Sequence, residues 1–102
     1  MIRVVIKTDE SSEKITSIEV KGHAGKDVYG KDLVCAAVSA ILTGGFNALD
    51  SKGYDFLLEE GHARAVAKKL PSDNDAVVLK TMLTQLQTIK EAEPEFIKIE
   101  IL

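Results

Sequence analysis

Hydrophobic and polar residues alternate in several short runs of this chain. In the run from Ile2 to Lys7 every second residue is aliphatic, which is typical of a strand with one buried face. Four further strands are predicted, at Ile15 to Lys21, Tyr54 to Glu59, Ala63 to Ala67 and Phe96 to Leu102. Polar turns join the first strand to the second and the third to the fourth, so we expect two hairpins.

Two longer runs have helical spacing instead. Val34, Val38 and Leu42 predict a helix that is capped by Asp32 and extends to about Ser51. A second helix is expected to end before Pro94 and to begin after a capping residue, which is Ser72, Asp73 or Asn74. The order ββαββαβ predicts an α+β fold in which two helices pack on one largely antiparallel sheet.

The paired glycines Gly44 and Gly45 fall inside the first predicted helix. Each costs about 1 kcal/mol relative to alanine at such a position. The pair therefore predicts either a bend in the helix or close contact with another backbone.

The length and the charge of the chain limit the range of functions it can have. The 102 residues are enough for one domain, covering 1–102, and too few for two. The net charge of -3 comes from 13 basic and 16 acidic residues that are mixed along the chain. No basic block is present that would track a phosphate backbone, so we expect no direct nucleic-acid binding and favour a basic protein as partner.

Cysteine content and hydropathy exclude further classes of function. A single cysteine forms no internal disulfide, and one Cys with two distant His residues makes no zinc pattern. We therefore expect no metal and no cofactor. The N-terminal apolar run is too short for a signal peptide, and no segment approaches the ~20 apolar residues that a membrane span needs. These features predict a cytoplasmic protein without a membrane partner.

The candidate site is the stretch from Gly22 to Ser39, which joins a strand to a helix through a polar loop. Cys35 stands three residues after the predicted cap and is therefore expected in the first helical turn. Free N–H groups and the helix dipole favour a thiolate there, and Lys31 adds positive charge nearby. The backbone N–H groups of Cys35 or Ala36 are candidate donors to an oxyanion.

His23 stands at the other end of this loop, where the chain's return would bring its imidazole near the sulfur as a general base. We expect this loop, which contains Gly22, Ala24, Gly25 and Gly30, to be a mobile surface loop. Asp32 and Ser39 are supporting candidates. Capping alone explains Asp32, and packing explains a hydroxyl on the Cys35 face.

Other interpretations of these residues exist. A lone cysteine in an apolar string is equally compatible with a small buried side chain, and His23 with an ordinary loop histidine. His62, at a hairpin turn, is interpreted as facing solvent. The pattern G-x-x-x-x-G-K ending at Lys31 is followed by Asp32 where a phosphate-binding loop needs Ser or Thr, which argues against nucleotide binding. A thiol phosphatase would need an arginine in the loop, and none is there.

The motif residues resemble the ribosomal-processing cysteine protease family of small bacterial proteins. Its signature combines Gly-His-Ala with a downstream Gly-x-Asp-x-Val-Cys-Ala-Ala-Val-Ser, which here are Gly22 to Ala24 and Gly30 to Ser39. The resemblance also extends over the whole chain in length and in the order of elements.

The resemblance implies a catalytic dyad of His23, as base and then acid, and Cys35, as nucleophile. It implies a substrate, the N-terminal extension of a large-subunit ribosomal protein, and a homodimer whose His-to-Cys loop moves to admit the peptide. The alternative function is a non-enzymatic ribosome-assembly factor that binds a ribosomal protein through the same loop. A reactive thiol would favour the enzyme, and an inert one the binding protein.

Overall fold

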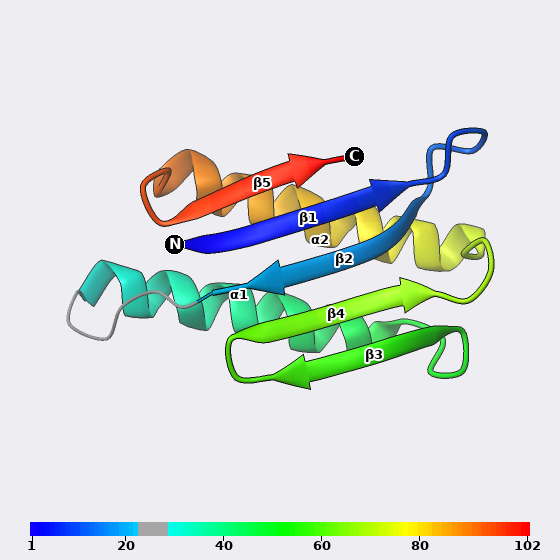
Figure 1. Cartoon of the computed structure of the whole chain (residues 1–102), viewed down its shortest axis with the longest axis horizontal. Coiled ribbons are helices and arrows are strands. Elements are labelled where there is room, and N and C mark those ends of the chain that lie inside the picture. The colour runs from blue at the N-terminus through cyan, green and yellow to red at the C-terminus, as the bar shows by residue number, and fades with distance from the viewer. Residues whose placement is uncertain (23–28) are drawn as a thin grey trace.

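The computed structural model describes residues 1–22 and 29–102 and contains five strands and two helices within them. In chain order the elements are β1 (Ile2–Thr8), β2 (Ile15–Lys21), α1 (Tyr29–Ala48), β3 (Tyr54–Glu59), β4 (His62–Ala67), α2 (Asp73–Ala92) and β5 (Ile97–Ile101) (Figure 1). The predicted order ββαββαβ and the α+β class are confirmed.

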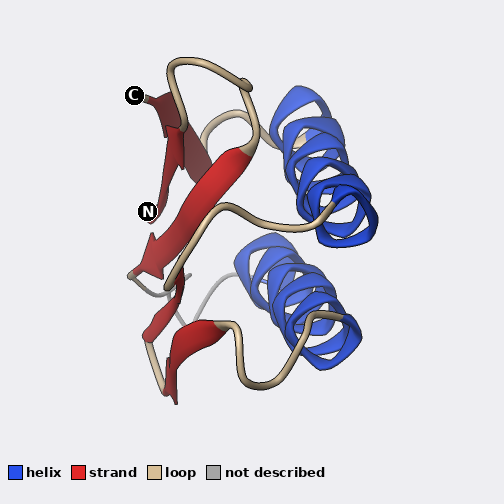
Figure 2. Ribbon diagram, turned by 90° about the vertical axis from the view of Figure 1, so that its right-hand side faces the viewer, coloured by secondary structure: helices blue, strands red, loops and turns tan. Residues whose placement is uncertain are grey.

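The strands form one sheet in the order β3-β4-β2-β1-β5. The pairs β1–β2, β2–β4 and β3–β4 are antiparallel, which confirms both hairpins, and β1–β5 is parallel. Both helices lie on the same face of this sheet, and within the described residues no helix covers the opposite face (Figure 2). The protein is therefore a two-layer structure with one covered and one open sheet face.

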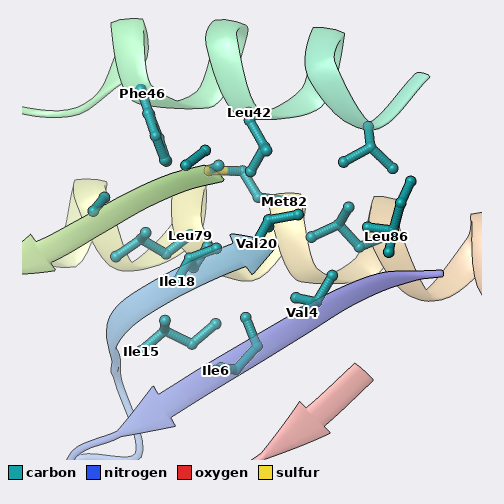
Figure 3. Packing of buried hydrophobic residues seen from close by; sticks show 14 of the residues in the cluster. Val4, Ile6, Ile15, Ile18, Val20, Leu42, Phe46, Leu79, Met82 and Leu86 are labelled. Carbon is teal, nitrogen blue, oxygen red and sulfur yellow. The ribbon is translucent and has the colours of Figure 1, made fainter. Parts of the chain in front are cut away.

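The core lies between the helices and the covered sheet face. Alternate residues of the central strands point into it, among them Val4, Ile6 and Ile18, each at most 1% exposed (Figure 3). Helix α2 supplies three more buried apolar residues, Leu79, Met82 and Leu86. Burial of these side chains is the main favourable term in the stability of the fold.

At Gly45 the first helix is in close contact with the second. A Cβ built on Gly45 would overlap the Met82 side chain, whose Cγ would lie 2.7 Å away, whereas a Cβ on Gly44 would meet nothing within 4 Å. The expected close contact is therefore present at Gly45 only, and its partner is a methionine side chain rather than a backbone.

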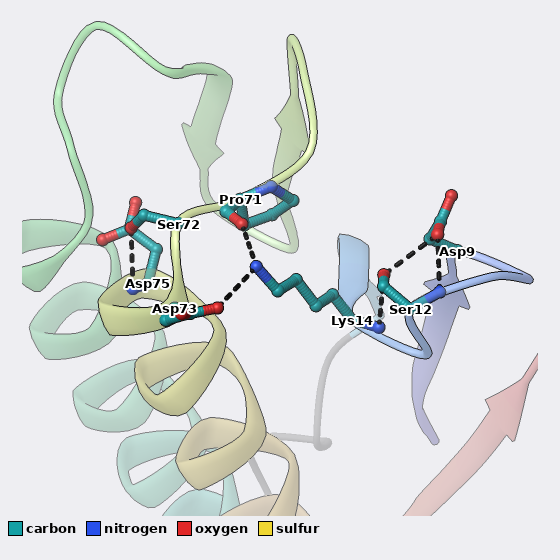
Figure 4. A network of polar contacts seen from close by, with 7 residues as sticks. All are labelled: Asp9, Ser12, Lys14, Pro71, Ser72, Asp73 and Asp75. Atoms are coloured by element: carbon teal, nitrogen blue, oxygen red, sulfur yellow. Dashed lines mark hydrogen bonds and ion pairs between the residues drawn. The ribbon is translucent and has the colours of Figure 1, made fainter.

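Polar contacts fix the start of α2. Ser72 is the N-cap, and its hydroxyl accepts a hydrogen bond from the Asp75 amide at 3.1 Å. Lys14 reaches the same turn from the β1–β2 hairpin (Figure 4). Its Nζ donates to the Pro71 carbonyl at 2.7 Å and pairs with Asp73 Oδ1 at 2.9 Å. These contacts attach the hairpin to the helix layer.

A buried hydrogen bond joins β3 to α2. Tyr54 Oη donates to Asp75 Oδ2 at 2.9 Å, and the Asp50 amide donates to the same oxygen at 3.2 Å. Burial and the Asp75 carboxylate raise the pKa of Tyr54 above its ordinary value. The phenol therefore stays protonated and remains a donor to a carboxylate that is only 6% exposed.

Candidate active site

Helix α1 begins earlier than the sequence predicts. Its first residue is Tyr29, so Asp32 is the fourth residue of the helix and the prediction that it is the N-cap is wrong. Gly30, expected in the loop, also belongs to the helix backbone. Gly30 costs the helix only about 1 kcal/mol, which the cooperative extension of a packed helix offsets.

The earlier start moves Cys35 away from the helix end. Cys35 is the seventh residue of α1 and lies in its second turn. Only the first four N–H groups of an α-helix lack a partner within it, and the effect of the dipole falls off after the first turn. The backbone N–H groups of Cys35 and Ala36 are therefore engaged in the helix, and the prediction that they form an oxyanion site is wrong.

The Cys35 side chain is half-buried and packs against the edge of the hydrophobic core. Its neighbour Val34 is 4% exposed and points into the core, whereas Ala36 is exposed. Cys35 is thus at the border between core and surface, neither enclosed in hydrocarbon nor free in solvent. Ser39 is exposed, one turn further along the same side of the helix.

Gly22, which follows β2, has a defined backbone conformation. Gly22 has φ +105°, a conformation that side chains rarely adopt, and a Cβ there would overlap the Met1 carbonyl oxygen. Its amide donates to the Gly61 carbonyl at 3.0 Å, which ties the end of β2 to the β3–β4 turn. His23, Ala24 and Gly25, which the sequence predicts to belong to the site, lie outside the described residues.

His62 does not simply face solvent, as the sequence indicated. Its Nε2 lies 2.7 Å from Glu19 Oε2, and the His62 side chain is 29% exposed. Arg64 Nη1 is 3.7 Å and Lys21 Nζ 4.0 Å from the same carboxylate oxygen. The hydrogen bond from His62 is the main reason that the pKa of Glu19 lies below its ordinary value.

This charged cluster and Cys35 are on opposite sides of the sheet. In β4, Ala63 and Ala65 are buried beneath the helices, so the alternate residues His62 and Arg64 point to the open face. Cys35 comes from the helix layer. No local pattern in the sequence predicts this cluster, because 43 residues separate Glu19 from His62 and only the strand register brings them together.

Two findings on ligands and membranes apply to residues 1–22 and 29–102. No group of three or more His, Cys, Asp or Glu side chains in this part of the chain is arranged to hold a metal ion. No helix in it is long and apolar enough to cross a membrane.

Comparison with known proteins assigns a class to this arrangement. The family model described as cysteine protease Prp matches residues 1–98. The ribosomal processing cysteine protease Prp of Staphylococcus aureus is 36% identical over 104 residues, which cover 97% of each chain. The protein of the same name from Mycoplasma genitalium is 37% identical over 81 residues, covering 78% of this chain and 81% of that one.

Two solved structures of a related protease match the fold of this chain over its full given length. Prp from S. aureus in complex with a substrate peptide has a TM-score of 0.89 at 34% identity, with 100% of both chains covered. The same protease with a covalently linked product peptide has a TM-score of 0.87 at 36% identity, again over 100% of both chains. A Streptococcus mutans protein, SMU.848, shares the fold at 24% identity with a TM-score of 0.86.

These comparisons show that the α+β fold, with its half-buried cysteine on the first helix, is that of a cysteine protease. This chain belongs to the cysteine protease Prp family, whose model covers nearly all of it. Its curated relatives are ribosomal processing enzymes.

Proposed function

We propose that this chain is an endopeptidase that removes the N-terminal extension of a large-subunit ribosomal protein, with Cys35 as nucleophile and His23 as general base. The observation that carries the proposal is that a member of a cysteine protease family has one cysteine in its sequence, and that this cysteine is only partly buried, at the border of the core. A thiolate is the nucleophile of such enzymes, so Cys35 is the residue available for the role.

The assignment of the base rests on elimination. The chain has two histidines, His23 and His62. His62 points to the open sheet face and is hydrogen-bonded to Glu19, with the sheet between it and the helix layer. His23 follows Gly22, which is held beside the β3–β4 turn, and it is the histidine left for the role.

The reaction follows from these two groups. The Cys35 sulfur attacks the scissile carbonyl carbon while its proton passes to His23, and a tetrahedral oxyanion forms. Collapse breaks the C–N bond, His23 gives the proton to the leaving amine, and a thioester remains on the sulfur. Water, deprotonated by His23, then attacks this thioester, releases the carboxylate product and restores the thiol.

The remaining parts of the site are also proposals. Asp32 and Ser39 are supporting residues on α1, and Ser39 lies one turn from the nucleophile. Gly22, Ala24, Gly25 and Gly30 are proposed as substrate-binding residues of the segment before the nucleophile. We further propose a homodimer that works in the cytoplasm, where a single free cysteine stays reduced.

The test is cleavage of the purified ribosomal protein precursor, followed by mass spectrometry of the new N-terminus. Cys35→Ala should lose cleavage completely and keep the circular dichroism spectrum, and His23→Ala should lose at least two orders of magnitude in rate. His62→Ala is the matched control and should cleave at nearly the normal rate. Full activity of Cys35→Ala would exclude the proposed nucleophile.

Alkylation of the thiol separates the enzyme from a binding protein. An activated Cys35 reacts quickly with iodoacetamide near neutral pH and slowly in the His23→Ala variant. An inert thiol, together with precursor that is bound but never cleaved, would favour an assembly factor instead.

A further inference from the structure

Two large apolar side chains are exposed on the edge strand β3. Phe56 is 39% and Leu58 58% exposed, although both project from the sheet face that carries the helices. The strand is last in the sheet order, and the helix layer does not cover it fully. Exposed apolar residues on an edge strand promote aggregation unless they have a use, so this surface needs an explanation.

The backbone of β3 also presents hydrogen-bonding groups at this edge. The Lys68 amide donates to the Gly53 carbonyl at 2.9 Å, and these two residues are opposite each other in the antiparallel register. Because bonded and non-bonded pairs alternate along an antiparallel ladder, Asp55 and Leu57 bond to β4. The N–H and C=O groups of Phe56 and Leu58 therefore point away from the sheet.

The edge is aligned with the nucleophile. Phe46 of α1 packs on Phe56, with ring centroids 5.4 Å apart, so this side of α1 faces β3. Cys35 precedes Phe46 by eleven residues, which places it about 20° from Phe46 around the helix axis and about 16 Å along it. Cys35 is therefore on the β3 side of α1. It is near the beginning of α1, and that end of the helix lies toward the side on which β3 finishes (Figure 1).

The charge of the strand indicates what it binds. From Tyr54 to Gly61 the chain carries Asp55, Glu59 and Glu60 and no lysine or arginine. Ribosomal proteins bind RNA phosphates through basic side chains, so a segment of such a protein is complementary to an acidic strand. A second copy of this chain would instead bring the same carboxylates together.

We propose that β3 is a docking strand for the substrate. An extended segment of the ribosomal protein precursor adds to the sheet at this edge, with its backbone bonded to Phe56 and Leu58 and its apolar side chains against theirs. Leu58 lies about 7 Å beyond Phe56 toward Cys35, which leaves about 10 Å, or three extended residues, to the scissile bond. The inference rests on the proposed function and names where its substrate binds.

The test compares Leu58→Ser with Ile101→Ser, which makes the same change at the opposite edge of the sheet, where Ile101 is 52% exposed. Binding of a fluorescent peptide spanning the precursor extension is measured in the Cys35→Ala background, so that cleavage is not required. Leu58→Ser should weaken binding roughly tenfold through lost apolar contact, and Ile101→Ser by less than twofold. Equal effects of the two variants would overturn the proposal.

A peptide with only two residues on each side of the scissile bond ends before Leu58, so wild type and Leu58→Ser should cleave it at equal rates. If the wild-type protein cleaved neither the short peptide nor the peptide that spans the precursor extension, the proposed function would be refuted. Binding of the longer peptide that depends on Leu58 would, even then, support the docking strand.

Amide hydrogen exchange examines the strand addition itself. The long peptide should slow exchange at Phe56 and Leu58, whose amides point outward, and change little at Leu57, whose amide already bonds to β4. Unchanged exchange at both outward amides would overturn the proposal. Protection without peptide that increases with protein concentration would also overturn it, because the edge would then belong to a second copy of the chain.

Discussion

The contact between Gly45 and Met82 predicts that alanine lowers the free energy of unfolding at position 45 and raises it at position 44. Gly45→Ala places a Cβ where the Met82 side chain lies, and Met82 is a core residue that is only 2% exposed. Overpacking of this kind costs about 1–3 kcal/mol, against a gain of about 1 kcal/mol in helix propensity. We expect Gly45→Ala to lower the free energy of unfolding by up to about 2 kcal/mol.

Gly44→Ala is the matched control, because its Cβ meets nothing within 4 Å. It keeps the gain in helix propensity and should raise the free energy of unfolding by about 1 kcal/mol. The difference between the two variants, about 1–3 kcal/mol, measures the overpacking alone. Urea unfolding gives these values, and thermal unfolding should separate the variants by at least about 4 °C.

A double variant identifies the obstructing side chain. In the background of Met82→Ala the space at Gly45 is free, so Gly45→Ala should now stabilise the protein about as much as Gly44→Ala does. If Gly45→Ala and Gly44→Ala were equally stable in the otherwise unchanged chain, the close packing of α1 on α2 would be refuted.

Two further predictions concern polar groups. Tyr54→Phe removes one donor from the buried Asp75 carboxylate and should cost about 1–3 kcal/mol in the free energy of unfolding, measured in urea; an unchanged midpoint would contradict the buried bond. The hydrogen bond from His62 lowers the pKa of folded Glu19, so its stabilising effect is present above the ordinary pKa and is lost as the pH falls through the lowered one. Glu19→Gln should therefore lose less stability than the unchanged chain between about pH 5 and pH 3, and identical acid profiles would argue against the pair.

Local patterns in the sequence were enough to predict most elements. The alternation of Ile15 to Lys21 and the three candidate caps Ser72 to Asn74 are signals contained within a few residues. The structure has a strand at the first position and a helix capped by Ser72 at the second. The start of α1 was predicted wrongly because Asp32 and Gly30 have the local features of a cap and a loop. The helix nevertheless continues through both, since its extension is cooperative and its later residues are held in the core.

Relationships between distant residues were not available from such patterns. The sequence predicted a strand at the C-terminal end without indicating that it pairs with β1 in parallel. The single cysteine was identified as the candidate nucleophile from composition and motif. Its position in the second helical turn, and the placement of His62 on the opposite sheet face, depend on where the helix begins and on the strand register.

The parallel pairing of β5 with β1 has a consequence for biosynthesis. Ile97 lies opposite Ile2, so a ribosome must translate the chain as far as Ile97 before this neighbour of the first strand exists. A nascent or prematurely terminated polypeptide ending before Ile97 would leave the β1 backbone unpaired along one side, ready to join another unfinished copy. We therefore expect such fragments to accumulate in inclusion bodies or to be degraded, rather than to persist as partly working enzymes.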